Sequence, residues 1–168
     1  HVFPGRRGYG PMEEEALTRY AVLRRIGVFG LNPDSRRGAA RFLQVGRLVL
    51  QTPDTSLWVT AEGAFTDPRR RPLRLRHGVA HLLHGQDNVV ALPLAMEYPF
   101  WNESAPEALL RFGPPVAADP GRSVADWQTT LTQALEATMD RLAEDALARD
   151  PARFETLVSG RVGIGGIY

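Results

Sequence analysis

Cysteine and lysine are both absent from the 168 residues of this chain. Without cysteine, the chain cannot form disulfide bonds or thiolate metal sites. All twenty basic residues are arginines, and 19 carboxylates oppose them, which leaves a net charge of +1. Bulk electrostatics therefore do not favour nucleic acid as a partner. Exclusive use of arginine, together with abundant alanine, glycine and proline, indicates a GC-rich bacterial genome.

Long apolar runs are also missing. No stretch approaches the roughly 20 apolar residues that a membrane-spanning helix needs, and no secretory signal peptide is recognisable. Hydrophobic residues nevertheless make up 43% of the chain, so a folded domain with a core is expected rather than a disordered segment. We therefore expect a protein of the cytoplasm or of a membrane surface.

Helical and strand patterns alternate in the first half of the chain, which predicts an α/β fold. Pro11 and the carboxylates at 13–15 indicate a helix start, and Gly27 indicates its end. The apolar run 28–31 predicts a strand. A helix is predicted over 35–51, where apolar residues recur at helical spacing after a capping residue.

Three further apolar segments predict strands at 57–61, 89–97 and 109–112, with a short helix from about 76 to 83. We expect these elements to form a mixed central sheet with helices on both faces. Residues 1–116 are the predicted α/β domain.

Residues 117–168 are predicted to form a helical C-terminal extension. Ser123 and Asp126 resemble a capping box, which opens a helix predicted to continue to about Arg149. A second helical stretch is predicted over 151–158.

The dipeptide Glu62-Gly63 follows the strand predicted at 57–61. A strand that ends in a carboxylate and a glycine turn places both at the carboxyl edge of a sheet, where open α/β folds bind ligands. Five arginines follow between residues 69 and 76. Such a cluster suits phosphate groups or an anionic membrane surface. A solvated loop is the alternative interpretation.

The order of three segments resembles that of the conserved blocks in the glycerolipid acyltransferases, the family of the lysophosphatidic acid acyltransferases. Ile26–Leu31 with Arg36–Ala40 is similar to the second block, Gly-x-Phe-Ile-x-Arg followed by Ser-x-Arg-x-x-Ala. Glu62-Gly63 matches the centre of the third block, Phe-Pro-Glu-Gly-Thr-Arg-Ser. Val89–Leu94 matches the fourth, a strand that runs into proline. The resemblance spans about residues 5–116.

This resemblance implies transfer of a fatty acyl group from acyl-CoA or acyl carrier protein to a lipid hydroxyl. The enzyme would serve phospholipid biosynthesis, bound peripherally to the cytoplasmic face of the membrane. The family's catalytic block is a histidine followed five positions later by an aspartate, and none of the four histidines here has that aspartate. The chain begins at His1 without methionine and ends in a glycine-rich stretch. We therefore expect an inactive fragment of a longer reading frame, with the catalytic block upstream.

The resemblance implies no cofactor and no metal, and it assigns acceptor binding to the segments that are present. The expected acceptor-binding residues are Glu62, Gly63, Arg36, Arg37 and Arg70. Asn32 and Phe65 stand where the family has phosphate-holding arginines. Neither side chain can form a charged fork on a phosphate, so an acceptor other than lysophosphatidic acid is expected.

Three alternatives remain open. His77, His81 and His84 have the spacing of one helical face and are a candidate metal site. The neighbouring Arg74 and Arg76 oppose the binding of a cation there. The second alternative is a noncatalytic lipid-binding relative of the family. The third is a structural or interaction module without a ligand.

Overall fold

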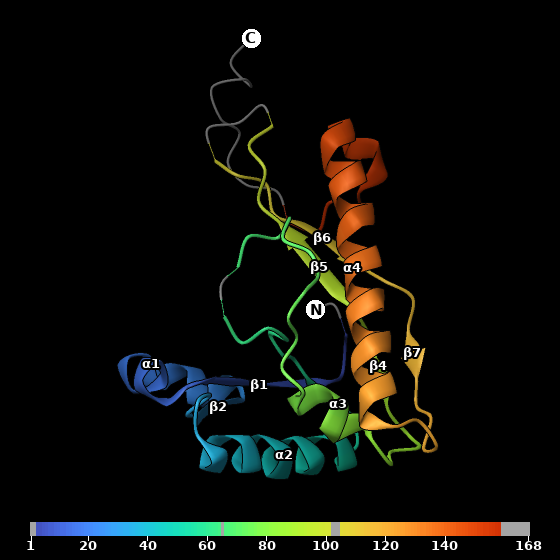
Figure 1. The fold of residues 1–168 in the computed structure, drawn as a ribbon. Coiled ribbons are helices and arrows are strands. Elements are labelled where there is room, and N and C mark those ends of the chain that lie inside the picture. The colour runs from blue at the N-terminus through green and yellow to red at the C-terminus, as the bar shows by residue number, and fades with distance from the viewer. Residues whose placement is uncertain (1–2, 65, 102–104, 159–168) are drawn as a thin grey trace. The chain divides into compact units, whose positions relative to one another are not determined.

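The computed structural model describes residues 3–64, 66–101 and 105–158 (Figure 1). These residues contain both helices and small sheets, which is compatible with the expected α/β class. Hydrogen bonds join the described strands into three small sheets, and not into the single mixed sheet that the sequence predicted.

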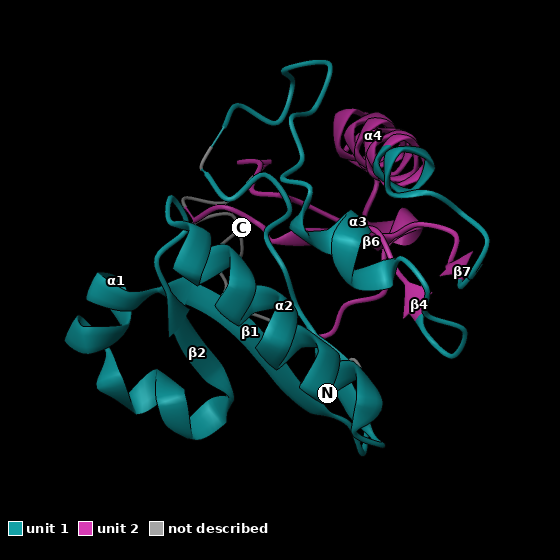
Figure 2. Cartoon of the chain, turned by 60° about the horizontal axis from the view of Figure 1, so that its bottom comes forward, with its two compact units in different colours: residues 1–89, 118–128 teal, residues 90–117, 129–168 magenta. Residues whose placement is uncertain are grey.

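The chain divides into two compact units (Figure 2). Unit 1 comprises residues 1–89 and 118–128, and unit 2 comprises residues 90–117 and 129–168. The chain leaves unit 1 after residue 89, returns to it at residue 118 and leaves it again after residue 128. The two domains expected from the sequence, residues 1–116 and 117–168, stay a prediction.

Unit 1 contains a parallel sheet of three strands in the order β2-β1-β3. Its strands are β1 (Arg7–Glu13), β2 (Val28–Leu31) and β3 (Thr55–Leu57). The strand predicted at 28–31 is confirmed by β2. The central strand β1 was not predicted at all, because Pro11 and the following carboxylates indicate a helix start.

The β1 ladders explain how a central strand tolerates proline. Residues Arg7 to Tyr9 pair with β3, whereas Gly10 to Glu13 pair with β2. At Pro11 only the edge of β1 that faces β2 forms a ladder. The missing N–H of proline therefore leaves no ladder bond unmade on the edge that faces β3.

The helix predicted before Gly27 is divided in the structure. It consists of α1 (Glu14–Arg19) and the 3₁₀ helix η1 (Ala21–Ile26). Gly27 ends η1 with a φ of 95°, the left-handed backbone conformation that is common where a glycine ends a helix. A side chain at Gly27 would overlap the carbonyl of Gly8, so this glycine also allows β1 to pass close by.

The helix α2 (Arg36–Gln51) confirms the helix predicted over 35–51. It lies along the parallel sheet (Figures 1 and 2), and its buried side includes Phe42 and Val49. The ladder of β3 ends at Leu57, so the strand predicted at 57–61 begins and ends earlier than expected.

Two glycines let α3 (Gly78–Leu83) approach α2 closely. A Cβ on Gly46 of α2 would come within 2.9 Å of a Leu82 methyl, and one on Gly78 would lie 3.1 Å from the Phe42 ring. The short helix predicted from about 76 to 83 is confirmed in this position.

Unit 2 contains two antiparallel ladders. β4 (Val90–Ala91) pairs with β7 (Val116–Ala117), and β5 (Leu94–Glu97) pairs with β6 (Leu109–Phe112). The strand predicted at 89–97 is therefore two strands, separated by Leu92 and Pro93, whereas the strand predicted at 109–112 is confirmed. The unit 2 core consists of Ala95, Leu109, Leu142 and Ala146, with Trp101, Met139 and Phe154 packed against it.

The long helix α4 (Val124–Ala148) confirms the helix predicted from the capping box. Ser123 Oγ accepts a hydrogen bond from the Asp126 amide at 3.2 Å and donates one to its carboxylate at 2.6 Å. In the stretch predicted as helical over 151–158, a 3₁₀ turn forms at Pro151–Arg153 only. No helix among the described residues is long and apolar enough to cross a membrane.

Candidate functional site

The turn predicted at Glu62-Gly63 is present in unit 1. The Gly63 amide donates to the Thr60 carbonyl at 3.0 Å, and Gly63 has a φ of 65°, which favours glycine. Both carboxylate oxygens of Glu62 are bonded. The Thr66 hydroxyl donates to one at 2.5 Å, and the Arg74 amide donates to the other at 3.2 Å. Glu62 thus closes the base of the arginine-rich loop.

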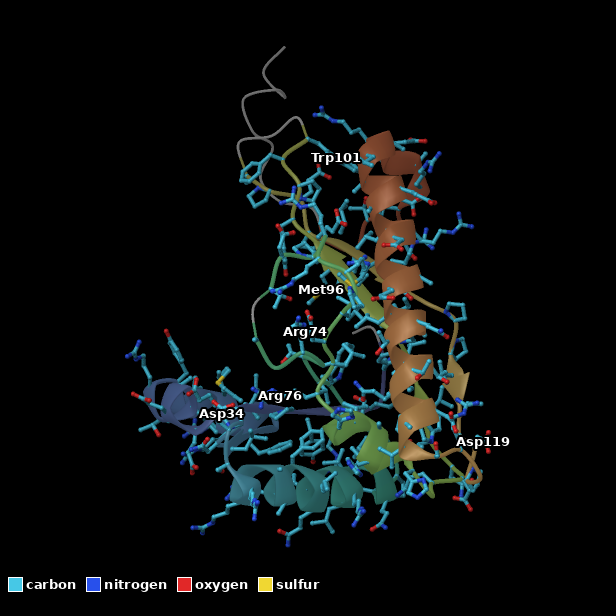
Figure 3. All side chains as sticks on the ribbon, viewed as in Figure 1. Asp34, Arg74, Arg76, Met96, Trp101 and Asp119 are labelled. Carbon is cyan, nitrogen blue, oxygen red and sulfur yellow. The ribbon has the colours of Figure 1, made fainter. Side chains whose placement is uncertain are left out.

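Arg76 lies directly against this turn. Its amide donates to the Ala61 carbonyl at 2.8 Å, and a Cβ on Gly63 would come within 2.6 Å of its Nε. The guanidinium also donates to the Pro33 carbonyl at 2.7 Å and to the Asp34 carboxylate at 3.0 Å. Figure 3 shows Asp34 and Arg76 side by side. Arg76 therefore joins the turn after β2 to the Glu62-Gly63 turn.

Hydrogen bonds also connect the turn after β2 to the start of α2. The Asn32 side-chain oxygen accepts from the Asp34 amide at 3.1 Å, and the Asn32 carbonyl accepts from the Ser35 hydroxyl at 3.1 Å. The Ser35 oxygen caps α2 by accepting from the Gly38 amide at 2.9 Å. A Cβ on Gly38 would overlap the Asn32 carbonyl, so this position needs glycine.

The other expected acceptor residues are placed less closely. Arg36 and Arg37 are exposed on the first turn of α2, immediately after the turn that follows β2. Arg70 is exposed in the loop, where its amide donates to the Asp67 carbonyl at 2.9 Å. Among the described residues, the contacts that join the two turns come from Arg76 and not from these three arginines. Phe65 lies outside the described residues.

The arginine-rich loop retains an excess of positive charge, because residues 62–76 hold five arginines and two carboxylates, and Asp34 neutralises only Arg76. Arg69 donates to both oxygens of Asp67, at 3.0 and 2.8 Å. These hydrogen bonds lower the pKa of Asp67 to about 2, and the Asp67 carboxylate raises the pKa of Arg69. Arg71 donates to the Pro68 carbonyl at 2.7 Å, which shapes the loop further.

The three histidines of the candidate metal site lie on and beside α3. His77 and His84 flank the helix, His81 lies within it, and all three are exposed. The ring of His84 lies 3.0 Å from the Arg122 carbonyl. Within the described ranges, no three histidine or carboxylate side chains converge as metal ligands would.

Sequence reasoning missed the pairing of Arg76 with Asp34 and Pro33. Arg76 is one of five arginines in the cluster, and no local pattern distinguishes it from the others. Its partners precede it by 43 and 42 residues, so only the tertiary structure reveals the pairing. No protein-family model matches the chain, and no curated protein or solved structure shows a significant similarity to it.

Replacing Arg76 by Met should separate the two turns without unfolding unit 1. The change keeps an unbranched stem and removes the bonds to Pro33 and Asp34. We expect a loss of about 1 kcal/mol in the free energy of unfolding, because these groups are partly exposed. The amide NMR signals of Gly63 and Asp34 should shift.

The matched control is Arg70→Met, which removes an exposed arginine of the same loop. It should leave both amide signals in place and change stability by less than about 0.5 kcal/mol. Equal shifts in the two variants would show that Arg76 does not join the turns.

Proposed function

We propose that this chain forms the acceptor side of an acyl transfer from acyl-CoA or acyl carrier protein to a lipid hydroxyl. The observation that carries the proposal is the Arg76 bridge. It draws together the turn after β2 and the Glu62-Gly63 turn. These are the two segments whose sequences resemble the second and third blocks of the glycerolipid acyltransferases.

In the proposed reaction, a histidine from a His-x-x-x-x-Asp block removes the proton of the acceptor hydroxyl. The hydroxyl oxygen then attacks the thioester carbonyl, and the thiol of the donor leaves. The block is not part of these residues, so this chain supplies the surface against which the acceptor lies. Glu62 acts there as a scaffold, because both of its carboxylate oxygens are already bonded.

The proposed setting is the cytoplasmic face of a bacterial membrane, with the protein bound peripherally. The exposed arginines of the 69–76 loop support it, since an anionic lipid surface attracts each nearby arginine by about 1 kcal/mol. Arg36 and Arg37 add positive charge at the first turn of α2. The headgroup of the lipid acceptor would lie between these exposed cations and the two turns that Arg76 connects. These two turns, the one after β2 and the one at Glu62-Gly63, are called the joined turns below.

The acceptor itself is proposed to be something other than lysophosphatidic acid. The Asn32 side-chain oxygen accepts a hydrogen bond from the Asp34 amide within the same turn, and the side chain carries no charge. The family has a phosphate-holding arginine at this position. Phe65 is the second such position. Charge-assisted hydrogen bonds are worth roughly 1.5–3 kcal/mol each, so losing two weakens phosphate binding by about two to four powers of ten. A neutral, zwitterionic or glycosylated lipid is therefore the preferred acceptor.

The test is a panel of acceptors assayed side by side with the full-length protein. We expect a neutral, zwitterionic or glycosylated lysolipid to give a higher kcat/KM than lysophosphatidic acid. Arg36→Ala and Arg70→Ala should raise the KM for acceptors with an anionic headgroup. The matched control Arg41→Ala, an exposed arginine further along α2, should not.

Two results would contradict the proposal. Residues 1–168 alone should show no acyl transfer, so turnover by this chain would require a base among its own residues. Lysophosphatidic acid as the best acceptor, with that preference lost in Arg36→Ala or Arg70→Ala, would show that these arginines replace the missing ones.

A further inference from the structure

An open hollow of about 390 Å³ lies in unit 1, away from the joined turns. It is formed by β1, β2, the end of η1 and the last turns of α2. Five of its lining residues are apolar: Val28, Phe29, Val45, Leu48 and Val49. An apolar lining with few polar groups is typical of small-molecule sites, and the volume falls at the low end of their range.

The hollow lies at the opposite end of α2 from the candidate acceptor site. Ser35 caps the first turn of α2 beside the joined turns, whereas Thr52 ends the helix beside the hollow. Val45, the lining residue of α2 nearest to Ser35, follows it by ten residues, which is about 15 Å at 1.5 Å per residue. A ligand in the hollow would therefore occupy a second site.

The C-terminal carbonyls of α2 that border the hollow are already bonded. The Thr52 hydroxyl donates to the Leu48 carbonyl at 2.7 Å, and the Thr55 hydroxyl donates to the Val49 carbonyl at 2.5 Å. The carbonyls of Leu48 and Val49 are therefore satisfied without a ligand.

Apolar side chains beside the hollow remain in solvent. Leu48, which lines it, is 59% exposed, and Ile26 at the end of η1 is 68% exposed. Val22, on the same 3₁₀ helix, is 66% exposed. Leu48 therefore offers an exposed apolar wall to a ligand in the hollow.

The charge at the hollow is positive. Arg24 lines it, and Arg25 follows in the last turn of η1. Arg24 forms no ion pair with any residue that the structure describes. Of the described residues that line the hollow, none is acidic. The apolar wall and the single cation together fit a ligand with a hydrocarbon chain and an anionic head.

We propose that this hollow binds one single-chain anionic amphiphile, of the fatty-acid type. The hydrocarbon chain lies on Phe29, Val45 and Val49, and the anionic head pairs with the guanidinium of Arg24. The site is independent of the acyl transfer proposed above, because it shares no residue with the joined turns.

The experiment measures binding to residues 1–168 by calorimetry and by methyl NMR. The main probe is decanoate, kept monomeric, and decanol and inorganic phosphate serve as its neutral and headgroup-only counterparts. We expect saturable binding of decanoate with shifts in the methyl signals of Val45, Leu48 and Val49. Decanol should bind about threefold to tenfold more weakly than decanoate, because it cannot pair with Arg24. Phosphate alone should not bind.

Two variants assign the site. Leu48→Asp places a carboxylate on an exposed wall residue and should weaken decanoate binding at least about tenfold, because it repels the head and desolvates poorly. Arg24→Gln should weaken decanoate about threefold to tenfold and leave decanol unchanged. The matched control Arg41→Gln, an exposed arginine of α2 outside the hollow, should bind decanoate as the parent chain does.

Several outcomes would overturn the proposal. One is decanoate binding that is equal in all variants, and another is binding that moves no methyl signal of the hollow. Equal affinity for decanoate and decanol, unaffected by Arg24→Gln, would remove the anionic head from the proposal. Binding to phosphatidylglycerol vesicles without any binding of monomeric decanoate would identify a membrane surface in place of a single-molecule site. Because the methyl shifts and Arg24→Gln need no wall substitution, the proposal stays testable if Leu48→Asp fails to fold.

Discussion

Replacing Gly38 by Ala should destabilise unit 1 by about 3 kcal/mol, at the upper end of the cost of overpacking. The added Cβ would overlap the Asn32 carbonyl, and the Asn32 amide would lie only 3.1 Å away. Both obstacles are backbone atoms in a turn held by the Ser35 cap and by Arg76. The turn can yield only by losing those bonds, so relief of the clash has its own cost.

Gly46→Ala is the matched control, because Gly46 is also a buried glycine of α2. Its nearest obstacles are Leu82 methyl groups at 2.9 and 3.1 Å, and the end of a leucine side chain can rotate away. Alanine gains roughly 0.5–1 kcal/mol over glycine inside a helix, which offsets part of the crowding. We expect this variant to stay within about 1 kcal/mol of the parent.

Urea unfolding measures both variants, with midpoints compared at equal slope. Gly38→Ala should also shift the amide NMR signals of Asp34 and Gly63, since the turn that must move is bonded to Arg76. If the two variants had equal stability, the close approach of α2 to the Asn32 turn would not exist in solution.

The sequence predicted best the elements whose signals are local. The helix α2 follows from apolar periodicity and the Ser35 cap, and both lie within its own residues. Gly27 ends η1 because its own φ is positive, which its identity as glycine already indicates. The Glu62-Gly63 turn was predictable for the same reason.

The central strand β1 could not be predicted because its pairing is entirely nonlocal. Its glycines and Pro11 are poor strand formers, and they are accepted because each ladder uses only part of the strand. Gly8 and Gly10 also allow Trp58 to approach closely, with its backbone oxygen 3.1 Å from a Cβ placed on Gly10. That benefit depends on a residue almost fifty positions away.

The candidate site shows the same division. Glu62 and Gly63 were predicted from their position after an apolar strand, and they lie at the junction of the two turns. Arg76, which makes the junction, resembles its neighbours in the cluster until its partners at Pro33 and Asp34 are seen. Charge clusters predict a kind of surface, but they do not predict which member will be bonded.

Replacing Asp145 by Asn should lower the Tm of the chain by roughly 3–8 °C near neutral pH. Asp145 is a mostly buried residue of α4, with 8% of its surface exposed. One of its carboxylate oxygens accepts from Arg111 and the other from Arg153, the latter at 3.1 Å. The asparagine would leave two guanidinium groups facing a neutral amide.

The size of this effect should depend on pH. The hydrogen bond from Arg111 lowers the pKa of Asp145 below its ordinary value of 3.8; burial acts in the opposite direction, and Arg153 lowers the pKa further. Because the pKa is lower in the folded protein, the stabilisation is fully present above about pH 4. It is lost as the pH falls through the lowered folded-state value.

Calorimetric melting of the parent chain and Asp145→Asn between pH 7 and pH 3 measures this dependence. The difference in Tm should be constant down to about pH 4 and should shrink below it. Glu144→Gln is the matched control, because it removes a carboxylate from the same helix whose ion pair with Arg141 is largely exposed. Exposed pairs contribute little, so Glu144→Gln should change Tm by less than about 2 °C. A Tm difference for Asp145→Asn that stayed unchanged at pH 3 would show that the charge of Asp145 does not stabilise unit 2.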